Sequence, residues 1–173
     1  MPISYVRQYI LPVVFAPGIV IHEFAHYLSC VLLGVPVGDV TFFRFGNPAG
    51  YVEHQVPRSY TKRILITFAP LLVNMAVAVG AFWWSTRTVL PYSLLAVYVG
   101  VTVVAKSLPS SIDAKNLFPH SRLGYVHPLF LLSLPLIFLL LLLNRLRPYR
   151  FQLFYTIGVS ALLLSVFFPE LKP

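Results

Sequence analysis

The feature that most constrains this chain is a series of five apolar runs, each long enough to cross a lipid bilayer as a helix. A spanning helix needs about 20 mainly apolar residues, and the runs are expected at 9–33, 64–84, 90–108, 126–144 and 151–168. Only 10% of the 173 residues are Asp, Glu, Lys or Arg, whereas soluble domains usually carry about 25%. The sequence therefore predicts an all-α, single-domain, multi-pass membrane protein with about five transmembrane helices.

The net charge of +8 is explained by membrane topology rather than by nucleic-acid binding. Lys and Arg stand mainly between the apolar runs, and the chain has neither a Gly-rich phosphate loop nor a basic stripe with interleaved aromatic residues. With the N-terminus outside, eight of the thirteen basic residues face the cytoplasm, so the positive-inside rule favours this orientation in the cell membrane. The first run is expected to remain in the mature protein, because it carries the motif described below.

A segment of a different kind, residues 35–54, separates the first two runs. Residues 40–45 are rich in β-branched and aromatic side chains, residues 46–50 are a turn cluster, and residues 51–54 again favour a strand. This pattern predicts a short β-hairpin between the first and second spans. Bare strands cannot face lipid, so the hairpin is expected at the interface or against protein, with Phe42, Phe43 and Phe45 as interfacial anchors.

The first apolar run contains His22-Glu23-Phe24-Ala25-His26, an H-E-x-x-H pattern. Residues four apart on a helix share one face, about 6 Å apart along the axis, so His22 and His26 can bind one zinc ion. Glu23 lies beside that face, where its carboxylate can act as a general base on water at the metal. A packing role is the alternative, but three ionisable side chains within a membrane span are costly unless something binds them.

A catalytic zinc ion usually takes three protein ligands and leaves one position for water. A carboxylate would offset the charge of the metal, and Asp113 is the acid that directly follows a span, after a break at Pro109. Its alternative role is to cap a short helix that begins at Ala114. Cys30 continues the face of the two histidines but is more simply a buried apolar residue. The remaining candidate ligands are His54, His120 and His127.

Along residues 15–118 the chain resembles the site-2 protease family of intramembrane zinc metalloproteases. Beyond the H-E-x-x-H pattern, Gly50-Tyr51-Val52 is similar to the strand that ends the small β element of that family. Segment 69–74 (Ala-Pro-Leu-Leu-Val-Asn) is similar to the family's Gly-Pro helix with its nearby Asn. Segment 108–114 (Leu-Pro-Ser-Ser-Ile-Asp-Ala) resembles the family's Leu-Pro-x-x-x-Leu-Asp-Gly, whose Asp is the third zinc ligand.

The chain also departs from the family pattern. Ala69 and Ala114 replace glycines, and the Asn-Pro often found before the Asp is absent. The segment after the second run, about residues 85–89, is too short for the PDZ domain that many relatives insert there. The chain is therefore similar to a small form of the family, with extra C-terminal spans at 126–144 and 151–168.

The resemblance implies one zinc ion per chain, with Glu23 as the catalytic base and with the ligands His22, His26 and Asp113. It implies substrate contacts at Asn74, Gly50 and Tyr51. Asn74 would orient the peptide or the developing oxyanion, although an interhelical hydrogen bond is equally open to it. The expected activity is hydrolysis of peptide bonds within or near transmembrane segments of membrane proteins, as in regulated intramembrane proteolysis. The hairpin would offer an edge to which such a segment adds as a strand.

Two other functions stay open at this point. A membrane protein that transports or stores a metal would also place His and Asp inside a bundle, but it would not need an acid at the position of Glu23. A catalytically inactive relative would bind transmembrane segments without cutting them. Metal content, measured together with cleavage by the intact protein and by Glu23→Gln, separates these functions from the protease.

Overall fold

The computed structural model describes residues 6–118, 128–146 and 151–168, and this part of the chain is mainly helical. The short N-terminal helices are η1 (Val6–Ile10) and α2 (Leu11–Val14), and α3 (Ala16–Leu32) follows them. Strands β1 (Val37–Thr41) and β2 (Tyr51–His54) come next. The remaining helices are α4 (Tyr60–Ser85), α5 (Tyr92–Ala105), α6 (Ser111–Asn116), α7 (Pro128–Leu146) and α8 (Phe151–Phe167).

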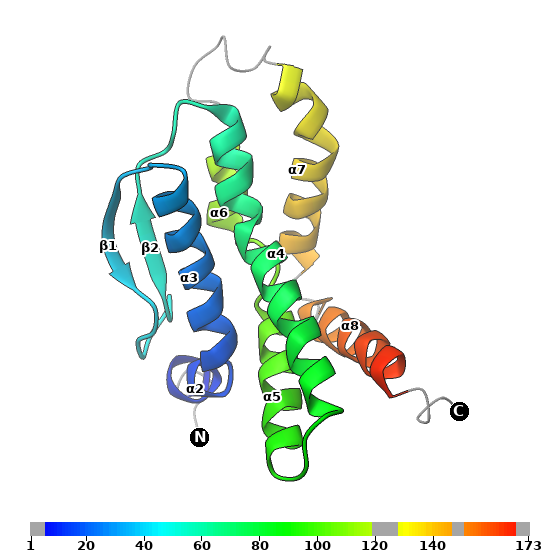
Figure 1. Cartoon of the computed structure of the whole chain (residues 1–173). Coiled ribbons are helices and arrows are strands. Elements are labelled where there is room, and N and C mark those ends of the chain that lie inside the picture. Colours follow the sequence, from blue (N-terminus) through cyan, green and yellow to red (C-terminus); the bar gives the residue numbers. More distant parts are fainter. Residues whose placement is uncertain (1–5, 119–127, 147–150, 169–173) are drawn as a thin grey trace.

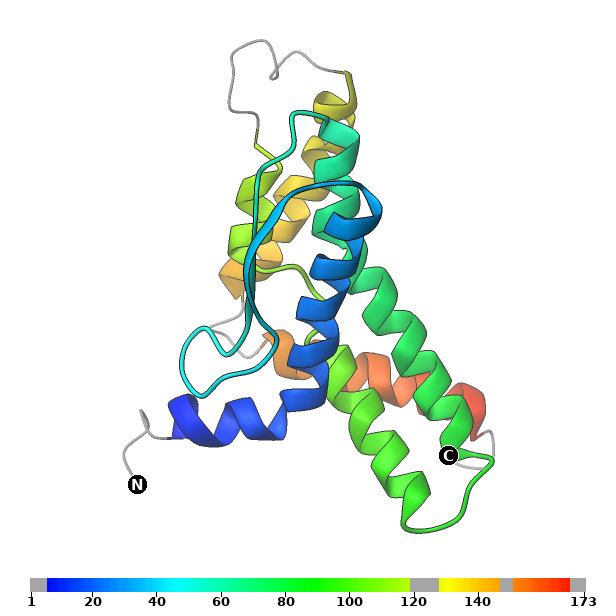
Figure 2. The same ribbon diagram turned by 60° about the vertical axis from the view of Figure 1, so that its left-hand side comes forward.

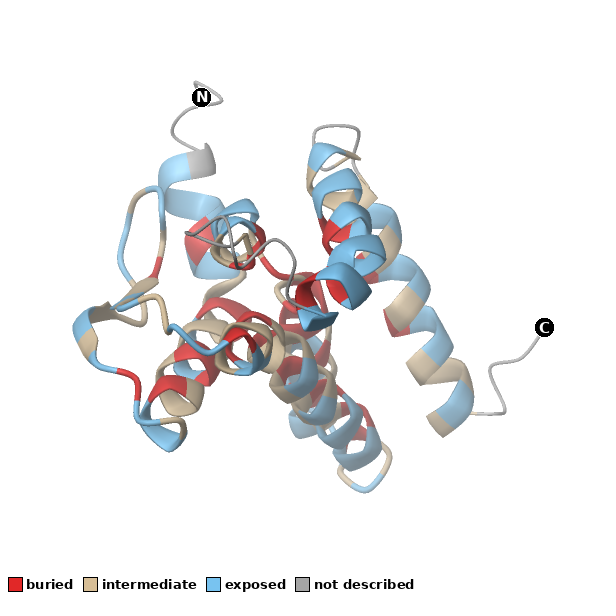
Figure 3. Ribbon diagram, turned by 90° about the horizontal axis from the view of Figure 1, so that it is seen from above, coloured by how far each residue is buried: buried red, intermediate tan, exposed pale blue. Residues whose placement is uncertain are grey.

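Several of these helices have the length and composition of membrane spans. Helices α4 and α7 are long and apolar enough to cross a membrane, and the bent pair Gln8–Val14 and Ala16–Leu32 makes a third candidate. Helices α5 and α8 are apolar but shorter, with 14 and 17 residues. Exposed positions lie on the outer faces of the helices (Figure 3), and many of them are large apolar side chains such as Leu132 and Phe154. The prediction of a helical, multi-pass membrane protein is confirmed to this extent, with two to three candidate spans.

The first apolar run is not the single straight helix that the sequence predicted. Its two parts meet at Phe15 and are bent by 76°, so that α2 lies across the end of α3 (Figure 2). Pro17, near the start of α3, has no backbone N–H and its ring clashes with the preceding turn, which favours a kink or a break of the helix at this point. Proline is well tolerated in the first turn of a helix, which fits a new helix starting at Ala16.

The hairpin lies between α3 and α4, as predicted, but its first strand is shifted. Strand β1 covers Val37–Thr41 rather than residues 40–45, and it pairs antiparallel with β2 through Val40 opposite Val52 and Thr41 opposite Tyr51. The aromatic residues leave the ladder because Phe42 turns towards α3, where its ring lies 6.1 Å from Phe24 and 5.8 Å from Tyr27. Residues 42–50 therefore form a long loop rather than a strand and a tight turn.

Helix α4 stands at the centre of the molecule, with α3 and the hairpin on one side and α7 and α8 on the other (Figure 1). One buried cluster joins α4 to α5 through Ala78, Phe82, Val103 and Val104, and side chains of α8 pack against it. A second cluster joins α4, α6 and α7 through Tyr60, Leu117, Phe130, Ile137 and Leu140. These contacts hold α3, α5 and α6 around one region, where the candidate site lies.

The third apolar run was expected to be helical up to residue 108, but α5 ends at Ala105 and the chain is not helical again until Ser111. Segment 106–110 contains Pro109, which cannot donate to a helix ladder. Side chains from three other elements satisfy the backbone here. The carbonyl oxygen of Lys106 accepts a hydrogen bond from His22 at 2.6 Å, that of Ala105 accepts one from Gln152, and that of Pro109 accepts one from Asn144 at 3.4 Å. Such an irregular segment is tolerated in apolar surroundings only where partners of this kind exist.

Candidate metal centre

Three side chains from two helices form a group that could hold a metal ion. His22 and His26 project from one face of α3, and Asp113 comes from α6. Their candidate ligand atoms all lie within 4.8 Å of one another. The three side chains are 12%, 7% and 13% exposed, so the group is largely buried. His26 and Asp113, 87 positions apart in the sequence, meet here because α3 and α6 both pack against α4.

Hydrogen bonds to backbone carbonyl groups orient both imidazoles. Nδ1 of His22 lies 2.6 Å from the carbonyl oxygen of Lys106, and Nδ1 of His26 lies 3.1 Å from that of Ile66. A carbonyl oxygen can only accept, so Nδ1 carries the proton in each ring and Nε2 keeps its lone pair. Metal-binding histidines are usually held in this way, because the bond fixes both the tautomer and the ring orientation.

Both free lone pairs face the carboxylate of Asp113. Nε2 of His26 lies 3.3 Å from Oδ1, and Nε2 of His22 lies 4.0 Å from Oδ2. Nε2 of His26 is buried and makes no hydrogen bond. A buried lone pair next to a carboxylate is unfavourable unless a cation or a proton lies between them. The donor set and this unsatisfied nitrogen fit a metal ion at the centre of the group.

Asp113 forms a helix cap and also belongs to the group that could hold a metal ion, so its position fits both alternatives that the sequence offered. The helix it caps begins at Ser111 rather than at Ala114, and the N-cap is Ser110. Oδ2 of Asp113 accepts from the Ser110 backbone N–H at 2.6 Å, and the Ser110 hydroxyl accepts from the Asp113 N–H at 3.2 Å. This is a capping box. It leaves Oδ1 directed at His26, so the cap fixes the carboxylate in the orientation that a metal ligand needs.

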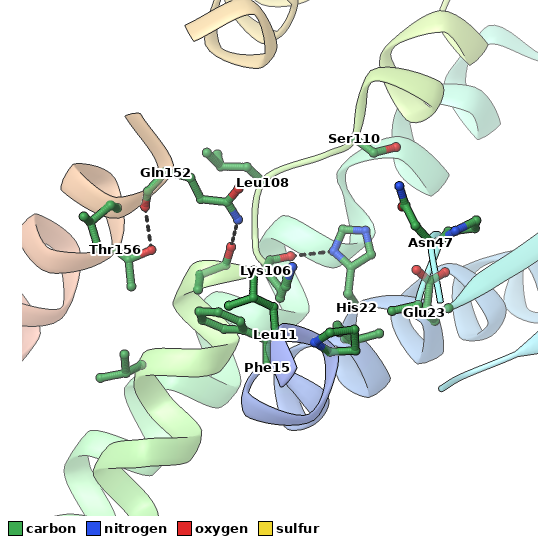
Figure 4. A pocket seen from close by; sticks show the side chains of 18 of the residues that line it. Leu11, Phe15, His22, Glu23, Asn47, Lys106, Leu108, Ser110, Gln152 and Thr156 are labelled. Atoms are coloured by element: carbon green, nitrogen blue, oxygen red, sulfur yellow. Dashed lines mark hydrogen bonds between the residues drawn. The ribbon is translucent and has the colours of Figure 1, made fainter. Parts of the chain in front are cut away.

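Glu23 lies at the edge of the same group, in the wall of a cleft of about 1240 Å³ that His22 also lines. Loop residues 46–50 also line this cleft, and Figure 4 shows Asn47 beside Glu23. Gly50 approaches closest, since a Cβ atom added there would lie 2.8 Å from Cγ of Glu23 and 2.9 Å from the carbonyl oxygen of Phe42. The hairpin loop therefore packs directly against the side-chain stem of Glu23, the residue that the sequence assigned as a base.

The predicted substrate-contact residues lie in different places. Gly50 lines the cleft, whereas neither Tyr51 nor Asn74 does. Asn74 is fully buried and donates a hydrogen bond to the carbonyl oxygen of Val103 at 3.3 Å, which is the interhelical role left open in the sequence. The ring of Tyr51 lies under the guanidinium group of Arg44, 4.9 Å away.

Among the described residues, the other candidate ligands, His54 and Cys30, are not part of the group. His54 lies on β2 with Nδ1 bonded to the neighbouring Gln55 carbonyl oxygen. Cys30 is fully buried and packs with Val35 and Ile66, as an apolar residue would. His120 and His127 lie outside the described residues.

Sequence reasoning missed several polar residues in the cleft wall, among them Lys106, Gln152 and Thr156. Gln152 and Thr156 bring α8, one of the extra C-terminal helices, into the site (Figure 4). The signal that could have found them is a polar side chain inside an otherwise apolar run, since such residues are usually functional or paired.

Comparisons of the chain with protein-family models, with curated proteins and with solved structures gave no match. What the protein does is therefore argued from its own residues.

Proposed function

We propose that this chain is an intramembrane zinc metalloprotease of the site-2 type. The observation that carries the proposal is the meeting of His22, His26 and Asp113, with ligand atoms within 4.8 Å of one another, beside Glu23 in a large cleft. An apolar helix bears the two histidines and the glutamate, and ionisable groups in such a position point to function.

The arrangement supports zinc as the metal. In a tetrahedral zinc site the metal–ligand distances are about 2.0–2.1 Å, so neighbouring ligand atoms lie about 3.3–3.4 Å apart. Nε2 of His26 and Oδ1 of Asp113 are 3.3 Å apart, and two imidazoles with one carboxylate are a common catalytic zinc set. The fourth position would face the cleft, because His22 and Glu23 both line it.

Bound zinc would act as a Lewis acid on the substrate carbonyl and on water. The protein's own groups carry out the rest. Glu23 takes a proton from the attacking water and passes it to the leaving amine. The backbone carbonyl groups of Lys106 and Ile66 keep the imidazoles oriented, and the capping box holds Asp113. Gly50 allows the hairpin loop to lie against Glu23 without displacing it.

We further propose that all five apolar runs cross or enter the bilayer, with α5 and α6 together forming the third span. Both helices pack against α4, and α6 lies beyond the end of α5 along α4 (Figure 1). Alone, α5 is about 21 Å long at 1.5 Å per residue, which is less than the roughly 30 Å of the hydrocarbon core. The break between them, segment 106–110, lies next to the candidate metal group.

The substrate would be a transmembrane segment of another membrane protein in an unwound form. A peptide bond in a helix is shielded by its neighbours and its own hydrogen bonds, so the segment must be extended where it is cut. The cleft between α2, α3, α5, α8 and loop 46–50 is large enough for several residues. The outer edge of the hairpin offers backbone groups to which such a segment could add as a strand.

The test uses the full chain purified in detergent. It measures the zinc content of the protein and its cleavage of a transmembrane peptide. Glu23→Gln is expected to keep its zinc and to lose cleavage, since the base is lost and the ligands remain. His22→Ala is expected to lose zinc as well, and His54→Ala serves as a matched control because His54 lies outside the group. Cleavage by Glu23→Gln at the wild-type rate would refute the assignment of the base. Zinc without cleavage in the wild type would favour a metal carrier or an inactive relative.

A further inference from the structure

Two neighbouring backbone carbonyl groups at the end of α5 are bonded by side chains from opposite parts of the chain. The carbonyl oxygen of Ala105 accepts from Nε2 of Gln152 on α8, and that of Lys106 accepts from Nδ1 of His22 on α3 at 2.6 Å. Figure 4 shows both bonds in the wall of the cleft. The second bond orients the imidazole in the candidate metal group, so whatever fixes the Lys106 carbonyl group also fixes His22.

The local sequence after α5 explains why side chains can reach both oxygens. In a continuing helix, the carbonyl group of each residue bonds to the N–H four positions later. Four positions after Ala105 stands Pro109, which has no N–H. Four positions after Lys106 stands Ser110, whose N–H donates to Oδ2 of Asp113 at 2.6 Å instead. One proline and one helix cap therefore release two adjacent carbonyl groups, of which α8 binds the first and α3 the second.

Helix α8 also holds the residue on the other side of Lys106. The hydroxyl of Ser107 donates its one hydrogen to the carbonyl oxygen of Val104 at 2.9 Å, so it accepts from the Tyr155 hydroxyl, 2.8 Å away. Ser107 is fully buried. Gln152 and Tyr155 are three positions apart on α8, and residues so spaced are neighbours on a helix surface. One turn of α8 therefore holds both sequence neighbours of Lys106.

Holding both neighbours restricts the direction of the carbonyl group between them. Peptide units are planar, and only two soft dihedrals per residue allow them to turn. Lys106 joins the unit whose oxygen Gln152 binds to the unit whose oxygen His22 binds. If the first unit lost its donor, its buried oxygen would turn to find another one. The next carbonyl group would turn with it, and the bond to His22 would lengthen or bend.

We propose that Gln152 and Tyr155 are positioning residues for His22, acting through their bonds to Ala105 and Ser107. This inference rests on the proposed function and deepens it, because it names what holds one of the metal ligands in place. It makes α8 a part of the metal centre, although this helix lies beyond residues 15–118, along which the chain resembles the site-2 proteases.

The first measurement follows the imidazole N–H groups of the metal-free full chain in lipid nanodiscs, by NMR with isotopically labelled histidine. The resonance of His22 is identified by its absence from His22→Ala, and that of His26 from His26→Ala. His26 is the internal control, because its Nδ1 bonds to the carbonyl oxygen of Ile66 on α4 rather than to the end of α5. The signal of His22 thus reports the proposed contact, and that of His26 reports the rest of the group.

Two variants remove the two bonds from α8. Gln152→Met removes the donor to Ala105 at similar size, and Tyr155→Phe removes a single oxygen atom. In each variant the Nδ1–H resonance of His22 is expected to move upfield, because a longer hydrogen bond deshields its proton less, and that of His26 is expected to stay. If Gln152→Met fails to fold, Tyr155→Phe carries the comparison alone.

The second measurement is zinc binding by the same variants, through competition with a chelator. Loss of a group that bonds directly to a metal-binding histidine costs about 10- to 100-fold in affinity. These residues act through one further peptide unit, so each variant is expected to bind zinc about three- to tenfold more weakly. The absorption spectrum of the cobalt(II) form is expected to change as well, because the geometry of one ligand changes.

Two control variants make similar changes elsewhere. Ser165→Ala removes a hydroxyl group of α8 that donates to the Leu162 carbonyl oxygen of its own helix. Gln55→Met removes the amide of an exposed residue just after β2. Both are expected to keep the zinc affinity, the cobalt spectrum and the two imidazole resonances of the wild type.

The outcomes separate this inference from the proposed function. A His22 resonance that stays at its wild-type position in both variants overturns the inference. Equal displacement of the His22 and His26 resonances also overturns it, since the effect would then be a general loosening of the fold. If the wild type binds no zinc but the variants shift His22 alone, the proposed zinc enzyme fails and the positioning of His22 by α8 stands.

Discussion

Replacing Gly50 with alanine tests the contact between the hairpin loop and the proposed catalytic base. The added Cβ atom would lie 2.8 Å from Cγ of Glu23, 2.9 Å from the backbone oxygen of Phe42 and 3.1 Å from Cγ2 of Ile19. Ordinary contacts begin at about 3.4 Å, so the loop and α3 must separate by roughly half an ångström. Phe42 belongs to the same loop and its carbonyl is backbone, so a change of rotamer cannot relieve that clash.

The expected cost follows from this displacement. A misplacement of about 1 Å at a catalytic group can reduce the rate by about a hundredfold, so half of that is expected to reduce kcat/KM by about tenfold. A tenfold loss corresponds to about 1.4 kcal/mol of transition-state stabilisation. Zinc content is expected to stay at the wild-type level, because the three atoms nearest to the added one belong to Glu23, Phe42 and Ile19, none of which is a proposed ligand. Overpacking is expected to lower the free energy of unfolding by about 1–3 kcal/mol.

The assay compares initial cleavage rates of a fluorogenic transmembrane peptide with zinc per chain measured on the same sample. Gly80→Ala is the control, since Gly80 lies inside α4 and an added Cβ atom would meet nothing within 4 Å. The control is expected to cut at the wild-type rate and to be slightly more stable, by up to about 1 kcal/mol. If Gly50→Ala also cuts at the wild-type rate, the loop does not position Glu23 and the reasoning is wrong.

The remaining predictions concern the proposed ligand Asp113, the contact between α3 and α5 at Gly18, and the topology. Asp113→Asn is expected to keep α6, because the amide oxygen can still accept from Ser110, but to lose zinc; retention of zinc and activity would place the ligand elsewhere. Gly18→Ala would put a Cβ atom 2.1 Å from the carbonyl oxygen of Thr102, so thermal unfolding is expected to show a free energy of unfolding lower by at least about 1–3 kcal/mol. Gly158→Ala is the control and is not expected to lower it, because a Cβ atom there would meet nothing within 4 Å. A cysteine at Arg58 in a Cys30→Ala background is expected to react with a membrane-impermeant thiol reagent only from the cytoplasmic side, and labelling from outside would contradict the N-outside orientation.

Periodic and local signals were enough to predict most elements of the fold. The apolar runs gave α4, α7 and α8 to within a few residues, because nothing in those runs competes with the helix except Pro70 and Pro135, which the helices accommodate. The hairpin was predicted from the turn cluster at residues 46–50. The group His22, Glu23 and His26 was visible because spacing on one helix fixes which side chains share a face.

The missed features depend on contacts between distant elements. The shift of β1 depends on the packing of Phe42 against Phe24 and Tyr27, which no strand propensity encodes. The end of α5 at Ala105 depends on side chains that bond to the freed carbonyl groups, one of them Gln152, 47 residues later. The sequence offered the cap and the metal ligand as alternatives for Asp113, and only the structure shows that one oxygen of its carboxylate accepts from Ser110 while the other lies near His26.

The break between α5 and α6 has a consequence for the order in which the protein assembles. Backbone groups of segment 106–110 and its flank are bonded by His22 from α3, Gln152 from α8 and Asn144 from α7. Until these helices have packed, the exposed carbonyl groups need water, so this segment cannot settle in apolar surroundings. The imidazole of His22 reaches its final orientation only through the same contact. The candidate metal group is therefore completed only when these helices have packed, because the contact that orients His22 forms at that stage.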